Sequence, residues 1–163
     1  MKRILLICVF AFVTCNVIAQ TLPQFGDIKL LKSKDYKLAE PTVVQTADFI
    51  ISSPIDKNTD TKTIAAQFLM KWMDGTPDFT FTLDENSTRY FLQNNELMMV
   101  YVASMAKYAI QNKPRNTKTI TINAIKNLLA YINDPANNVK KTDELKELSQ
   151  ANDNGQLETF LNL

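Results

Sequence analysis

The sequence predicts an all-α fold: a compact orthogonal bundle of about six helices around a central buried helix at residues 96–112, with an extended strap at 78–83. The first indication is composition, because only three glycines occur in 163 residues. The second is that apolar residues recur at helical spacing in several segments separated by Pro, Asn and Asp. The third is the segment ELMMVYVASMAKYAIQN, which is apolar on nearly every side, as is typical of a helix inside a bundle. It is too short to cross a bilayer, which needs roughly 18 or more apolar residues in a row.

Residues 1–19 have the features of a signal peptide. Lys2 and Arg3 give a positive start, and an apolar run follows over residues 4–13. Val17-Ile18-Ala19 then approximates a signal-peptidase site. We therefore expect cleavage after Ala19 and a periplasmic or secreted protein with no integral membrane segment.

Two alternatives to a cleaved signal remain. One is a retained membrane anchor, for which the apolar run is short. The other is a lipoprotein acylated on Cys15, although Thr14 is a poor match to the small residue expected before a lipidated cysteine.

Cleavage changes the chemistry available to the chain. Both cysteines leave with the signal, and the chain has no histidine. Because Lys2 and Arg3 also leave, 16 basic residues face 17 acidic ones and the formal charge becomes −1. This balance gives no electrostatic basis for binding nucleic acid. It also means that the apolar core, without disulfides, must stabilise the fold.

A flexible lead-in at residues 20–37 is expected to precede a single helical domain at 38–163. We expect its first helix to have Pro41 in the first turn, where a missing N–H costs nothing. Ser53-Pro54 ends this helix. Its apolar stripe is Val43, Val44, Ala47, Ile50 and Ile51.

The second helix is expected to be capped by Asp60 or Thr61. We expect it to end at residues 74–77, with Gly75 in the left-handed conformation and Pro77 preventing its continuation. One face carries Ile64, Ala65, Phe68, Leu69, Trp72 and Met73. The opposite, exposed face carries Lys62, Gln67 and Lys71.

The strap at 78–83 has a period of two, with Phe79, Phe81 and Leu83 alternating with threonines. No second strand of equal quality accompanies it, so we expect an extended segment lying on the helices. A short helix over 84–95 then turns Tyr90, Phe91 and Leu92 inward.

Three helices are expected after the central one. Residues 119–133 form an amphipathic helix that Asp134-Pro135 ends. Thr142 caps a helix over 143–151. Asn154-Gly155 precedes a last short helix that is expected to end at Leu163.

The composition excludes several classes of site. Without His or Cys, the exported chain has no Ser-His-Asp triad, no cysteine nucleophile and no His-based zinc site. Three glycines supply no phosphate-binding loop. Asp56, Asn58 and Asp60 have the spacing of calcium ligands, but Thr61 and Gln67 stand where an EF-hand needs Gly and Glu. We expect no cofactor and no metal.

The candidate ligand-binding residues are Lys71, Trp72, Asp74 and Asp78, where polar groups flank an aromatic ring. The aromatic set Trp72, Phe79, Phe81, Tyr90 and Phe91 either lines a groove or forms core. Asp74, Asp78, Asp84 and Glu85 cluster in the sequence, and paired carboxylates can perform acid–base hydrolysis, although carboxylates at turns and helix starts are ordinary.

The patterns at residues 68–79, 135–138 and 142–145, with a signal ending in Ala19-Gln20, resemble a group of small exported helical proteins from Gram-negative bacteria whose function is unknown. The resemblance covers most of residues 40–150. It implies a helical fold and an exported protein, and it implies no catalytic residue.

We therefore expect a non-enzymatic binding or interaction module in the cell envelope, with an envelope protein or a small ligand as its partner. The alternative is a carboxylate-using hydrolase in the periplasm. An enzyme of that kind needs a cavity with at least two carboxylates of raised pKa. A binding module needs an exposed apolar surface.

The exported protein is expected to begin at Gln20. N-terminal sequencing and intact-mass measurement of the protein from the native envelope fraction check this. A chain that still begins at Met1, or one that carries a lipid on Cys15, would contradict it.

Overall fold

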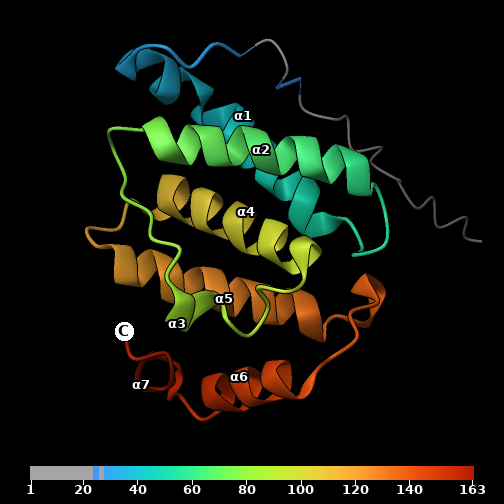
Figure 1. The fold of residues 1–163 in the computed structure, drawn as a ribbon. Helices are drawn as coiled ribbons and strands as arrows, with labels where there is room; N and C mark the ends of the chain where they lie inside the picture. Colours follow the sequence, from blue (N-terminus) through green and yellow to red (C-terminus); the bar gives the residue numbers. More distant parts are fainter. Residues whose placement is uncertain (1–23, 26–27) are drawn as a thin grey trace, which may run out of the picture.

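The computed structural model describes residues 24–25 and 28–163, and this part of the chain is an all-α bundle (Figure 1). Its elements are α1 (Ser33–Ser52), α2 (Thr59–Gly75), α3 (Glu85–Thr88), α4 (Asn95–Asn112), α5 (Thr117–Asn133), the 3-10 helix η1 (Pro135–Asn137), α6 (Asp143–Asp153) and α7 (Leu157–Phe160). The described residues contain no strand, so the predicted fold class is confirmed. The predicted signal peptide at 1–19 lies outside the described residues.

Helix α4 is the centre of the bundle. It packs against α1, α2 and α5, and Figure 1 shows α2, α4 and α5 one below another with α1 behind α2. Tyr101, Val102 and Met105 are buried, and Met98 is partly buried against the same core. The central helix predicted at 96–112 is therefore confirmed to within one residue.

The predicted start of the first helix is wrong. Helix α1 begins at Ser33, eight residues before Pro41, so that Ser33 to Lys37 belong to the helix and not to the lead-in. Asp35 closes its first turn by accepting from the Lys32 backbone N–H at 2.9 Å. Pro41 removes the donor that the Lys37 carbonyl would otherwise have. Burial of the surrounding helix against the core outweighs that loss, as tertiary packing often outweighs propensity.

The second helix also begins earlier than predicted. Asn58, in the left-handed conformation, precedes α2, whereas Asp60 or Thr61 was the expected cap. Two positions on this helix have the opposite burial from the prediction. Ile64 is 55% exposed, and Lys62 is only 1% exposed.

The buried Lys62 ammonium joins two parts of the fold. It donates to the Pro54 and Ile55 carbonyls at 3.1 and 3.0 Å. The same nitrogen lies 2.6 Å from Oε2 of Glu96 in the first turn of α4, as an ion pair outside the angles of a hydrogen bond. A buried charge is tolerated when it is paired and hydrogen-bonded. Lys62 therefore holds the α1–α2 loop against the start of α4.

The same loop is attached to the end of α5. The Tyr131 hydroxyl donates to the Ser53 carbonyl at 2.8 Å. The buried Asn137 side chain donates to the Tyr131 carbonyl at 2.9 Å. The Asn137 carbonyl in turn accepts from the Ile55 N–H at 3.1 Å.

The helix predicted over 84–95 is a single helical turn, α3, followed by turns up to Gln93. Tyr90 and Phe91 are buried as predicted, but Leu92 is half exposed. Helix α6 lies where the sequence placed it, and Thr142 caps it as predicted. Helix α7 follows Gly155 as predicted but ends at Phe160, before the expected end at Leu163. Within the described ranges, no helix has both the length and the hydropathy needed to cross a membrane.

Gly75 is required by a close approach. The glycine is the last residue of α2, and Gly155 is the only described glycine with a positive φ. The predicted left-handed conformation of Gly75 is therefore wrong. A Cβ at Gly75 would overlap the phenol of Tyr36 on α1, whose hydroxyl donates to the Leu30 carbonyl at 3.4 Å. The missing side chain lets α1 and α2 approach each other at this end.

Tyr101 is a polar group in the middle of the core. Its hydroxyl is buried and has no hydrogen bond of ordinary geometry. Burial raises the pKa of Tyr101 to about 12, and the nearby Thr121 and Ser87 hydroxyls oppose this shift in part.

We expect Tyr101→Phe to keep or raise stability at neutral pH, because it removes a buried hydroxyl without a partner. Tyrosine in an unfolded chain ionises near pH 10. Ionisation of Tyr101 therefore leaves the free energy of unfolding unchanged below pH 10. It lowers the free energy of unfolding as the pH rises from 10 toward 12, because the unfolded chain then loses the proton first. The loss is on the order of 3 kcal/mol for a shift of two pH units. Urea unfolding of both proteins across that range should show a shallower decline for the variant, and parallel declines would contradict the prediction.

We expect Gly75→Ala to have opposite effects in two backgrounds. In the natural protein it destabilises by about 1–2 kcal/mol, because the new methyl group displaces the Tyr36 ring. In a Tyr36→Ala background it stabilises by about 0.5–1 kcal/mol, because alanine loses less backbone entropy than glycine. Urea unfolding of the four proteins measures both effects, and an effect of the same sign in the two backgrounds would contradict the close-approach explanation.

Candidate functional site

Trp72 organises the region where the sequence places a ligand site. Its side chain is fully buried, and the indole Nε1 donates to the Tyr36 carbonyl of α1 at 2.9 Å. The Phe79 and Phe81 rings each lie 6.1 Å from the indole, centroid to centroid. Trp72 therefore has no surface to offer a ligand, and its contacts fix the strap on α2.

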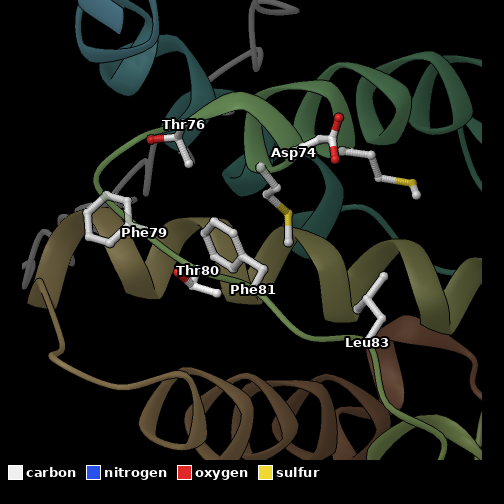
Figure 2. A pocket seen from close by; sticks show the side chains of 8 residues that line it. Asp74, Thr76, Phe79, Thr80, Phe81 and Leu83 are labelled. Carbon is white, nitrogen blue, oxygen red and sulfur yellow. The ribbon is translucent and has the colours of Figure 1, made fainter.

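The strap and the last turns of α2 enclose an open groove of about 440 Å³. Figure 2 shows Phe79, Phe81 and Leu83 following one another along the strap, with Asp74 and Thr76 above them. The groove is lined by Met70, Met73, Asp74, Thr76, Phe79, Thr80, Phe81 and Leu83. A volume of this size is within the range of small-molecule sites.

Two side chains give the groove an exposed apolar surface. Met70 is 50% exposed and Leu83 is 46% exposed, although both are large apolar residues. The flexible, polarisable thioethers of Met70 and Met73 can adapt to ligands of different shape. The alternation predicted for the strap explains the position of Leu83. Leu83 lies on the same side of the strap as Phe79 and Phe81, but beyond the part that packs on Trp72, so its side chain stays exposed.

Asp74 is the one carboxylate in the groove lining. It makes no ion pair or hydrogen bond with any described residue. Its charge disfavours an anionic ligand and favours a neutral or cationic one.

The other two predicted ligand residues lie outside this groove. Asp78 lines a separate cavity of about 250 Å³ and pairs with Lys37 at 3.3 Å. Glu40 and then Asp78 raise the pKa of the Lys37 ammonium by hydrogen bonding. Lys71 is exposed on α2 and lines none of the cavities described here. Of the four predicted residues, Asp74 lines the groove, and Trp72 contributes indirectly by packing against Phe79 and Phe81.

The carboxylates that form a cluster in the sequence have separate roles in the structure. Asp84 caps α3 by accepting from the Ser87 N–H at 3.0 Å, and Asp78 is paired with Lys37. The groove has one carboxylate in its lining, Asp74, and the 250 Å³ cavity has one, Asp78. Among the described residues, no group of three or more His, Cys, Asp or Glu side chains is arranged to hold a metal ion.

The aromatic set divides between groove and core. Phe79 and Phe81 line the groove, whereas Phe91 packs on Tyr101 at 5.1 Å and Tyr90 stacks on Phe160 at 5.3 Å. Met70 lines the groove but was not among the residues predicted from the sequence. A signal for Met70 was present in the sequence, because it is an apolar residue outside the apolar stripe of its helix and is therefore expected to be exposed.

The comparisons with known proteins give no relative from which a function could be transferred. No protein-family model, no curated protein and no solved structure matches this chain.

Proposed function

We propose that the protein is a non-enzymatic binding protein of the cell envelope that holds a small apolar ligand in the groove between α2 and the strap. The observation that carries the proposal is the groove itself, in which the large apolar side chains of Met70 and Leu83 stay about half exposed beside a single unpaired carboxylate. The export signal expected at residues 1–19 supports a place in the envelope.

The chemistry of the lining defines the ligand. Burial of apolar surface contributes roughly 25 cal/mol per Å², so methionine, phenylalanine and leucine side chains supply the affinity. Thr76 and Thr80 add hydroxyl groups that can orient a polar end of the ligand. Asp74 selects against negative charge, so the ligand is neutral or cationic.

Hydrolysis by a pair of carboxylates is a less well supported hypothesis for the groove between α2 and the strap. Such a mechanism places an acid and a base, or an acid and a nucleophile, on either side of the scissile bond. Asp74 has no second carboxylate in the groove lining, and Asp78 lines another cavity. A lone carboxylate is sufficient for binding and insufficient for this chemistry.

We expect the neutral probe N-phenylnaphthylamine to bind the native protein saturably. We expect Met70→Lys to weaken binding about tenfold, because it replaces an apolar contact with a hydrated charged side chain one helical turn from Asp74. Fluorescence titration measures both affinities. The matched control is Ile64→Lys, because Ile64 has similar exposure on the same helix and lies outside the groove.

The control variant should bind the probe as the natural protein does. Absence of saturable binding, or equal weakening by the two substitutions, would refute a binding site in the groove. Circular dichroism of each variant establishes that the helices are retained.

A further inference from the structure

Another cavity, of about 380 Å³, lies between the α3–α4 connection and the start of α6. Its polar lining includes Arg89, Gln93 and Asn94 from the first segment and Lys140, Thr142 and Glu144 from the second. Two cations therefore face one cavity that is separate in sequence and in lining from the groove.

Arg89 is held in place by an aromatic ring. Its Cζ lies 4.8 Å from the centroid of the Tyr90 ring, and Nη2 donates to the Tyr90 hydroxyl at 2.6 Å. Tyr90 is itself stacked on Phe160 of α7. A guanidinium has five N–H donors, so most of them remain for a ligand. Arg89 has no carboxylate partner among the described residues.

Lys140 is the second cation. It is exposed, and it makes no hydrogen bond or ion pair with the described part of the chain. Two unpaired positive charges at one cavity make its electrostatic potential positive.

The helix ends around the cavity add to this potential. Asn94 and Thr142, which line the cavity, are the N-caps of α4 and α6. The N-terminus of a helix carries partial positive charge.

Glu144 is the opposing charge in the lining, and its carboxylate is directed to its own helix. A hydrogen bond to its own backbone N–H, and then one to the Thr142 hydroxyl, lowers the pKa of this carboxyl group. Two cations against one carboxylate leave the lining with a formal charge of +1.

The cavity also has an apolar part. Four buried side chains in its lining supply this part, namely those of Tyr90, Phe91, Leu97 and Leu145. A ligand that fills the cavity thus meets both cationic donors and hydrocarbon.

We infer that this cavity binds a small organic anion, a carboxylate or a sulfonate carried on an apolar body. Arg89 and Lys140 bind the anionic group with charge-assisted hydrogen bonds. The apolar part of the lining contacts the rest of the ligand. The site is independent of the apolar groove, since no lining residue is shared between them.

The test uses anilinonaphthalene sulfonate, which carries the required charge on an aromatic body, on the full folded chain. N-phenylnaphthylamine is its matched neutral probe. We expect Lys140→Gln and Arg89→Gln each to weaken binding of the sulfonate about tenfold and to leave the neutral probe unaffected. The control Lys126→Gln removes the same charge from an exposed position of α5 outside this cavity and should change neither affinity.

Backbone amide shifts separate this proposal from the proposed function. The sulfonate should shift amides at residues 89–97 and 140–145, and the neutral probe those at 70–83. A sulfonate that shifts only the groove amides, or that binds Lys140→Gln and Arg89→Gln as it binds the natural protein, overturns the anion site while leaving the groove intact. Equal weakening by Lys126→Gln overturns it too, because the effect would then depend on net charge alone. Lys140 has no structural contact that a substitution would remove, so its variant remains informative even if Arg89→Gln unfolds.

Discussion

The contacts of the Trp72 indole are the constraint on which the candidate site depends. One buried ring joins three segments: it belongs to α2, it donates to a carbonyl of α1, and it packs against two phenylalanines of the strap. An extended segment without strand partners has few backbone contacts of its own to fix it, so its aromatic side chains must do so. The groove exists because Trp72 holds Phe79 and Phe81 in place, while Leu83 and Met70 do not take part in that aromatic contact and stay exposed.

Local signals in the sequence predicted the parts of the fold that local chemistry determines. The run of apolar residues in α4, the proline after α2 and the cap at Thr142 each act within a few residues, and the elements that they predict are present. The failures came from long-range contacts. Helix α1 continues past Pro41 because its tertiary packing outweighs the lost hydrogen bond. Lys62 can be buried because Glu96 of α4 and two carbonyls of the preceding loop bind its ammonium group. Nothing in the pattern around Lys62 distinguishes it from an exposed lysine, since its carboxylate partner lies 34 residues further along the chain.

The candidate site was only partly predictable for the same reason. Proximity in sequence suggested that Lys71, Asp74 and Asp78 act together, but the turn after Gly75 sends Asp78 toward Lys37 and leaves Asp74 with apolar neighbours. The cavity at Arg89 and Lys140 could not be found from the sequence, because about fifty residues separate its two cations and the packing of α6 brings them to one place. The molecule thus has two separate cavities of opposite formal charge, one lined by a lone carboxylate and one lined by two cations and one carboxylate.

The burial of Lys62 has a practical consequence for observing how this fold opens. Amine-reactive reagents modify a lysine only when solvent reaches its nitrogen, and Lys62 is the lysine that the described residues enclose most fully. Its acylation therefore requires the α1–α2 loop to separate from α4, and the rate of that acylation reports a local opening event below the level of global unfolding. The acylation rate of Lys62 therefore measures how often the α1–α2 loop separates from α4. The exposed lysines of the same chain serve as the internal reference for reagent activity.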